Sequence, residues 1–172
     1  GSEYFSIFIR EIANNKIISK EITDTSGSIL FSLDDKYIFY SKLDKNHRAR
    51  KIFRHEIGNF QYTDELIFEE KSDAFTVGIA LSADEKYFFI TTSDHNTSEQ
   101  YLFPVNEQKP NPKLIKKRKK GIIYSLNSWD NYFYCHTNEN AEDFKIERCK
   151  DLLNQNWEIY ISPVSYTHLR AH

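Results

Sequence analysis

Leu81-Ser-Ala-Asp-Glu-Lys-Tyr-Phe-Phe-Ile90 is one of three similar stretches that together specify the architecture of this chain. In each copy, an apolar residue and a short polar segment precede a run of aromatic and β-branched residues. Small polar residues favour tight turns, whereas aromatic and β-branched residues suit a pleated, partly buried surface. Each copy therefore predicts a strand, a turn and a second strand. The other two copies are Phe31-Ser-Leu-Asp-Asp-Lys-Tyr-Ile-Phe-Tyr40 and Leu126-Asn-Ser-Trp-Asp-Asn-Tyr-Phe-Tyr-Cys135.

The three copies, called cassettes below, recur at a regular interval. The tyrosine at their seventh position is Tyr37, then Tyr87 after 50 residues, then Tyr132 after 45. A period of about 40–50 residues with several strands per unit is typical of a β-propeller blade. The third cassette places strands at 121–126 and 131–137. Since no segment shows a sustained helical period, we predict an all-β fold: an open, partial β-propeller of about three and a half four-stranded antiparallel blades.

The cassettes and the polar segments between them also predict the limits of each unit. Residues 4–10 and 16–22 are expected to form two strands joined by Asn14-Asn15. A partial fan leaves blade faces and edges uncovered, so we expect the chain to self-associate through them. The predicted units are a tag-removal scar at 1–2, the outer half of a blade at 3–22, blades at 23–70, 71–116 and 117–163, and a vector-derived tail at 164–172.

Charge and cysteine usage narrow the classes of partner. Lysine and arginine number 23 and acidic residues 25, and this net charge of −2 gives no whole-chain attraction to nucleic acid or to an anionic membrane. Cys135 and Cys149 match no zinc or redox spacing, and so few cysteines suit a reducing compartment. The sequence shows no signal peptide and no long apolar span. We therefore expect a cytoplasmic protein with no nucleic-acid partner, no membrane partner and no cofactor.

The titratable residues offer no convincing active site. The adjacent carboxylates Asp34/Asp35 and Asp84/Glu85 fall in equivalent cassette turns, where turn capping explains them better than acid–base catalysis. No histidine lies near another ligand at metal-binding spacing, and there is neither a Gly-x-Ser-x-Gly elbow nor a phosphate-binding glycine loop. We expect no catalytic residue and no metal site in this chain.

The run Lys116-Lys-Arg-Lys-Lys120 is the sharpest local charge feature. Five consecutive cations are able to neutralise phosphates or an acidic partner, and binding of nucleic acid would then weaken steeply with salt. The interpretation that we favour is a solvated connector between two blades, kept soluble by its charge.

Several short motifs, taken together, point to a known family. In their order and spacing they resemble the oligopeptidase B group of the prolyl oligopeptidase family of serine peptidases, and the similarity runs from about Glu3 to Ile161. The motifs are Arg54-His-Glu-Ile-Gly58, Leu66-Ile-Phe-Glu-Glu-Lys71 with Phe75 and Val77, Thr97-Ser-Glu99, Arg118 with Tyr124-Ser-Leu126, and His136-Thr-Asn138 with Asn140 and Phe144.

This resemblance implies a seven-bladed propeller set over an α/β-hydrolase domain that carries a Ser-Asp-His triad. Such enzymes cleave oligopeptides after Arg or Lys, and the propeller restricts entry to short or unfolded chains. The catalytic groups would lie in the peptidase domain, so no catalytic role is transferred to any residue of 1–172. The implied partners are the peptidase domain of the same parent chain and oligopeptide substrates.

The resulting hypothesis is a propeller fragment that gates a serine oligopeptidase and is inactive alone. His47, Arg48, Lys117 and Arg118 are the predicted gating or interdomain residues, because polar loops rather than core strands meet substrate or another domain. The alternative is a non-enzymatic, WD-repeat-like propeller that acts as a protein-binding scaffold. Trp129-Asp130 would supply its dipeptide, although this pair sits in a turn before a strand instead of ending one.

Overall fold

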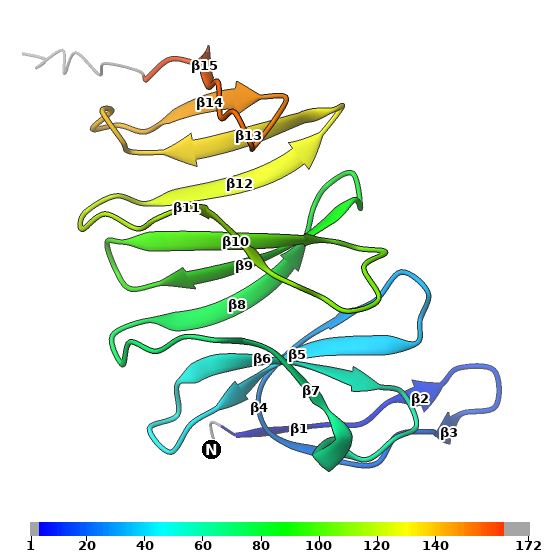
Figure 1. The fold of residues 1–172 in the computed structure, drawn as a ribbon. Helices are drawn as coiled ribbons and strands as arrows, with labels where there is room; N and C mark the ends of the chain where they lie inside the picture. The colour runs from blue at the N-terminus through cyan, green and yellow to red at the C-terminus, as the bar shows by residue number, and fades with distance from the viewer. Residues whose placement is uncertain (1–3, 164–172) are drawn as a thin grey trace, which may run out of the picture.

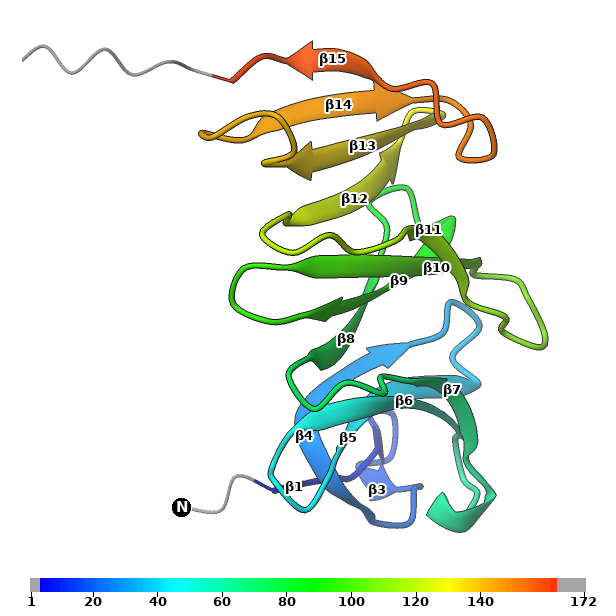
Figure 2. The same cartoon turned by 60° about the vertical axis from the view of Figure 1, so that its left-hand side comes forward.

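Three antiparallel sheets stacked in chain order, together with a separate two-stranded hairpin, make up the fold of this protein, which is described here from a computed structural model covering residues 4–163 (Figure 1). Turning the molecule shows the sheets following one another from the N-terminal to the C-terminal end (Figure 2). The first sheet has the order β1 (Phe5–Ile7), β4 (Ile22–Phe31), β5 (Tyr37–Leu43), β6 (Ala49–Glu56) and β7 (Glu65–Glu69).

The second and third sheets have four strands each, and each strand pairs with its neighbour in the chain. None of the sheets formed by residues 4–163 closes on itself, so the arrangement is an open fan. Over the same residues, no helix is long and apolar enough to cross a membrane. The second sheet contains β8 (Thr76–Leu81), β9 (Tyr87–Ser93), β10 (Ser98–Pro104) and β11 (Lys113–Lys116), and the third contains β12 (Tyr124–Trp129), β13 (Tyr132–Thr137), β14 (Lys145–Cys149) and β15 (Glu158–Ile161).

The first two cassettes fold as predicted, and their carboxylates cap the turns. In the first turn, Asp34 Oδ1 accepts a hydrogen bond from Ser32 Oγ at 2.6 Å, and in the second Asp84 Oδ1 accepts one from Ser82 Oγ at 2.8 Å. Asp35 (φ 55°) and Glu85 (φ 57°) occupy the left-handed position that follows. These contacts confirm turn capping as the role of the first carboxylate of each pair, Asp34 and Asp84.

The third cassette turns differently, and the strand predicted at 121–126 is displaced as a result. Asp130 (φ 47°) and Asn131 (φ 61°) are both left-handed, which makes a two-residue hairpin turn, so β12 continues to Trp129. Its Ser128 hydroxyl donates to Asp84 Oδ2 at 2.7 Å, and this bond joins the third cassette to the second.

Apolar residues from facing sheets fill the spaces between them. Between the first and second sheets, Phe39 and Ile52 pack against side chains from β8, β9 and β10. Between the second and third sheets, Phe89 packs with Cys135, and other members of that cluster come from β11 and β12. Two apolar clusters, one in each space, therefore help to hold the three sheets face to face.

The N-terminal segment differs from the two full strands expected at 4–10 and 16–22. Residues 5–7 form β1, which pairs with β4 as a fifth strand of the first sheet, and only β2 (Arg10–Glu11) and β3 (Lys16–Ile17) form a separate hairpin. The physical reason is burial, because Ile7 and Ile9 cover the outer face of the first sheet beside Ile38. The predicted limits of the units stay a prediction, and the predicted scar at 1–2 and tail at 164–172 lie outside the described residues.

Candidate functional site

The turns that follow the second strand of each cassette gather at one edge of the fan, together with the two segments that connect successive sheets (left in Figure 1). Antiparallel strands reverse direction at each turn, so the cassette turns lie at the opposite edge. We call the edge that carries the other turns and the two connecting segments the loop face. It consists of 44–48, 70–75, 94–97, 117–123 and 138–144.

All four predicted gating residues lie on the loop face, but in two separate turns. His47 (φ 59°) and Arg48 belong to the β5–β6 turn, and Arg48 Nη1 donates to the backbone carbonyl of Asp73 at 2.6 Å. Lys117 and Arg118 belong to the β11–β12 connector, where Lys117 is exposed. Arg48 and Arg118 both contact the connector between the first two sheets, and their gating role stays a prediction.

Arg118 is the centre of an ion-pair cluster on this face. Its two terminal nitrogens each donate to one carboxylate oxygen of Glu70 at 3.1 Å, the fork geometry that makes arginine pairs strong. Its backbone N–H donates to Glu99 Oε1 at 3.0 Å, and its guanidinium lies 4.1 Å from the centre of the Phe75 ring. Thr92 Oγ1 also donates to Glu70. We call these five residues the Arg118 clamp.

The clamp ties together segments that are far apart in sequence. Glu70 and Glu99 are only 3% and 4% exposed, so their charges depend on Arg118 and on hydrogen bonds rather than on water. Glu70 follows the last strand of the first sheet, Glu99 lies on β10, and Arg118 precedes the third sheet. One side chain thus links the connectors on both sides of the second sheet.

A second arginine fixes the same connector from the first sheet. Arg50, on β6, donates from Nη2 to the backbone carbonyls of Glu70 and Lys71, both at 2.9 Å. It also pairs with Asp73 and lies 3.9 Å from Asp44 Oδ2. The connector is therefore held on one side by Arg50 and on the other by the Arg118 clamp.

Hydrogen bonding sets the protonation of the clamp. Burial alone would raise the pKa of Glu70, but hydrogen bonds from Arg118, from Thr92 and from the backbone of Ser72 hold that pKa below its ordinary value. The hydrogen bonds to Glu70 in turn raise the pKa of the Arg118 guanidinium, against the opposite effect of burial. At neutral pH the pair is fully ionised.

This ionisation predicts acid sensitivity. Because the pKa of Glu70 is lower in the folded chain than in the unfolded chain, its contribution to stability is present above the unfolded value of about 4.5 and is lost as the pH falls through the folded value. We expect the unfolding temperature of the native chain to fall more steeply between about pH 5 and pH 3 than that of Glu70→Gln. Calorimetry across this range measures the difference, and parallel curves would contradict the prediction.

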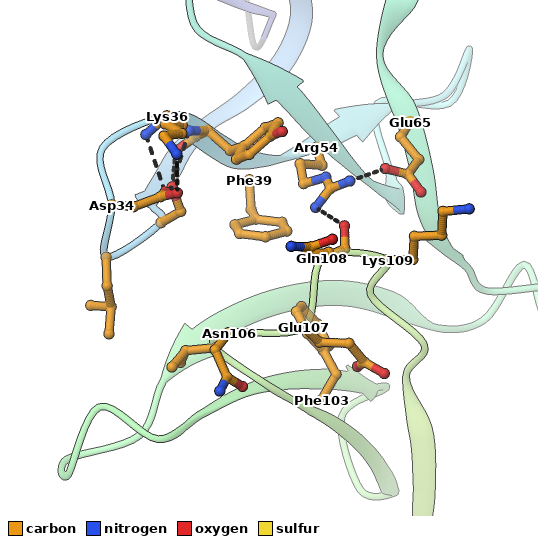
Figure 3. Close-up of a pocket in the computed structure, with 14 residues that line it drawn as sticks. Asp34, Lys36, Phe39, Arg54, Glu65, Phe103, Asn106, Glu107, Gln108 and Lys109 are labelled. Carbon is orange, nitrogen blue, oxygen red and sulfur yellow. Dashed lines mark hydrogen bonds and ion pairs between the residues drawn. The ribbon is translucent and has the colours of Figure 1, made fainter.

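A cavity of about 740 Å³ lies at the opposite edge, between the first sheet and the β10–β11 loop (Figure 3). Arg54 crosses it, donating to Glu65 Oε2 at 2.5 Å and to the backbone carbonyl of Gln108 at 2.9 Å. The guanidinium also lies 4.5 Å from the centre of the Tyr37 ring. Arg54 is therefore paired within the chain, and it holds the loop against the first sheet.

His55 and Cys135 are both closed to a substrate, because each side chain is fully buried. His55 Nδ1 lies 2.6 Å from Asp64 Oδ1, but the two side chains are 0% and 2% exposed, so no substrate reaches this pair. Cys135 is buried as a free thiol, and burial raises its pKa to about 11, which keeps it protonated. Among residues 4–163, no group of three or more His, Cys, Asp or Glu side chains is placed to hold a metal ion.

Glu70, Glu99 and Arg50 were absent from the predicted site residues. A signal for the clamp was nevertheless present, because four of its members stand in the motifs that carry the family resemblance. Glu70 and Phe75 belong to one motif, Glu99 to a second and Arg118 to a third. Motifs separated in the sequence meet here in one cluster.

Comparisons with known proteins identify the family to which the chain belongs. The family described as "Prolyl oligopeptidase, N-terminal beta-propeller domain" matches residues 1–168. Protease 2 of Moraxella lacunata is 31% identical over 151 residues, which are 87% of this chain and 22% of that protein. Dipeptidyl aminopeptidase BI of Pseudoxanthomonas mexicana is 23% identical over 148 residues, 85% of this chain and 20% of that protein. The chain thus spans about a fifth of the length of these relatives.

Solved structures match the fold. Oligopeptidase B of Leishmania major superposes with a TM-score of 0.88 at 21% identity, over 94% of this chain and 23% of that one. Oligopeptidase B of Trypanosoma brucei, in a closed form with covalently bound antipain, gives a TM-score of 0.79 at 23% identity, over 84% of this chain and 21% of that one. These matches confirm the partial propeller.

Proposed function

Because the chain belongs to the N-terminal β-propeller family of prolyl oligopeptidases, we propose that it is the gating part of a serine peptidase that cleaves short peptides after Arg or Lys. The observation that carries the proposal is the 31% identity to Protease 2 across almost the whole chain. Cleavage itself belongs to a peptidase domain of the same parent protein, where a serine attacks the peptide carbonyl and a histidine acts as base.

The role proposed for this chain is to position the peptidase domain and to restrict which peptides enter. The Arg118 clamp and Arg50 fix the connector between the first two sheets, so the loop face is a rigid surface with charged groups at defined places. His47, Arg48 and Lys117 lie on that face and are proposed to meet the peptidase domain or the incoming peptide. Arg118 acts in this scheme mainly through the connector that it holds.

The test uses the whole product of the parent gene. We expect it to hydrolyse a chromogenic peptide ending in Arg, and one ending in Lys, far faster than the same peptide ending in Leu. The 172-residue chain assayed in parallel serves as a control and should be silent. A parent with no hydrolase activity would overturn the peptidase function and favour the scaffold alternative.

Substitutions on the loop face test gating separately from chemistry. In the whole protein, Arg48→Ala combined with Lys117→Ala is expected to change the ratio of kcat/KM between a long and a short Arg peptide. Unchanged kinetics on both peptides would exclude a gating role for these two residues.

Two further proposals concern the chain in its surroundings: a cytoplasmic location, and self-association of the isolated fragment through its end sheets. The second is supported by the exposed apolar residues of β15, where Ile159 is 59% and Ile161 is 48% exposed. Light scattering at micromolar concentration should then give a mass above that of one chain, and a strictly monomeric profile would contradict it.

A further inference from the structure

Arg148, on β14, is held in a fixed position on the outward side of the third sheet, the last of the stack (Figure 2). Cys135 packs toward the second sheet, so the adjacent residue on β13, Tyr134, and its cross-strand partner Arg148 face away from it. The Arg148 guanidinium lies 4.6 Å from the centre of the Tyr132 ring, and its Nε donates to Glu158 Oε1 on β15 at 2.7 Å. Because this hydrogen bond uses Nε, the terminal nitrogens stay available to a further acceptor.

The first sheet carries the same group of three residues at equivalent positions. Both tyrosines stand at the seventh position of a cassette, and both arginines are direct cross-strand partners of a glutamate on the last strand of the sheet. The distances from guanidinium to ring centre, 4.5 and 4.6 Å, agree. The second sheet has Leu102 in place of the arginine, so the group is not a feature of every repeat. Tyr37, Arg54 and Glu65 are the counterparts of Tyr132, Arg148 and Glu158.

In the first sheet, this group holds the sheet that follows. Arg54 Nη1 donates to the backbone carbonyl of Gln108, in the β10–β11 loop of the second sheet, at 2.9 Å. On β7, the Phe68 ring packs against the ring of Tyr101 on β10, with the ring centres 4.6 Å apart. An arginine on one sheet thus fixes a loop of the next sheet, and an apolar side chain on its last strand covers an aromatic residue of the next sheet's third strand.

On the third sheet, the corresponding positions are uncovered. The side chain of Arg148 is 30% exposed, against 12% for Arg54. Ile161 takes on β15 the place that Phe68 takes on β7, beside the register shift in each sheet, and it is 48% exposed. The chain spans only 22% of Protease 2, so the parent protein proposed above has further chain to cover this side.

We propose that the outward side of the third sheet docks a further antiparallel sheet of the same parent chain, and that Arg148 fixes it by donating to a backbone carbonyl in the loop between its third and fourth strands. An apolar or aromatic residue of its third strand covers Ile161. Gln108 follows Arg54 by 54 residues, so the accepting carbonyl lies about 54 residues beyond Arg148 along the parent chain. Arg148 is therefore a positioning residue for the next sheet. The inference rests on the proposed parent protein but not on its cleavage specificity.

A photo-cross-link in the whole product of the parent gene tests the contact directly. Ile161 is replaced by p-benzoylphenylalanine, which leaves Arg148 intact, and peptide mass spectrometry locates the cross-link after irradiation. Since Tyr101 follows Phe68 by 33 residues, we expect an intramolecular cross-link about 33 residues beyond Ile161. The matched control carries the same group at Ile159, which lies on the other side of β15, and should give at least about tenfold less of this product.

Hydrogen exchange then tests Arg148 itself. In the whole protein, Arg148→Met should raise the exchange rates of β14, β15 and the docked loop by at least about tenfold. Arg148→Lys should behave like Arg148→Met, since a single ammonium group cannot hold both Glu158 and a carbonyl in fork geometry. In the 172-residue chain, which lacks the further sheet, Arg148→Met should change exchange in β14 and β15 by less than about threefold. Lys113→Met, which removes an exposed cation on β11, should stay within about twofold in either protein.

Three results would overturn the proposal. A cross-link from the Ile161 position to any other segment, or none at all, would remove the docked sheet. Equal effects of Arg148→Met in the whole protein and in the 172-residue chain would reduce Arg148 to a support within its own sheet. Cross-links only between two molecules would assign this side to a second copy of the chain. Circular dichroism verifies that every variant folds, and the peptidase function fails separately, as absence of cleavage by the whole parent protein.

Discussion

Replacing Arg118 by methionine is expected to lower the free energy of unfolding by about 2–4 kcal/mol. The substitution keeps most of the apolar stem but leaves the carboxylates of Glu70 and Glu99 buried without their cation. Breaking a buried pair costs more than the pair contributes, because the remaining charge stays out of water. The side chain of Arg118 is 30% exposed, so water entering the gap reduces the loss below that of a fully buried pair. Urea unfolding followed by tryptophan fluorescence measures the change.

Lys117→Met is the matched control, since it removes a neighbouring cation that is exposed. It should change stability by less than about 0.5 kcal/mol. Arg118→Met combined with Glu70→Gln should recover part of the loss, because the buried carboxylate is then neutral. A single Arg118 variant as stable as the native chain would show that the clamp does not hold the connector.

Phe88→Ala is expected to cost about 3–5 kcal/mol, the largest effect of any single substitution proposed for this chain. Phe88 is 1% exposed, and its ring lies 4.9 Å from that of Phe39 and 5.3 Å from that of Phe103. It stands where the first two sheets meet, so its removal leaves a cavity at the interface rather than within one sheet. Thermal unfolding by calorimetry gives the magnitude.

Phe8→Ala provides the comparison, because Phe8 is 56% exposed. The loss there should be below about 1 kcal/mol. If the two variants were equally destabilised, the packing between the first two sheets would not be the main support of the fan.

Turns and strands that depend only on residues close together in the sequence were predictable. The strand–turn–strand units around Asp34 and Asp84 were predictable, since the turn is capped by side chains two residues away and the strands follow from residue type. The turn at Asp130-Asn131 was misplaced, because the same kinds of residue also form a shorter hairpin loop.

The clamp was not predictable in the same way. Arg118 and Glu70 are 48 residues apart, and no local pattern states that they meet. The pairing of β1 with β4 was missed for a similar reason: the isoleucines of the N-terminal segment fit either a separate blade or the open face of the first sheet. Long-range pairings of this kind are decided by which apolar sheet faces would otherwise stay exposed to water.

The way in which the sheets touch has a consequence for cooperativity. The strongest contacts between sheets join β6 with β8 and β10 with β12, so each sheet is supported chiefly by its neighbours in the chain. Stability in such an array is a sum of unit terms and nearest-neighbour coupling terms. An end unit, coupled on one side only, melts at lower cost than the middle unit, and a ring removes this weakness because every unit then has two neighbours. A linear fan is therefore expected to fray from its ends, with the second sheet as its most persistent part.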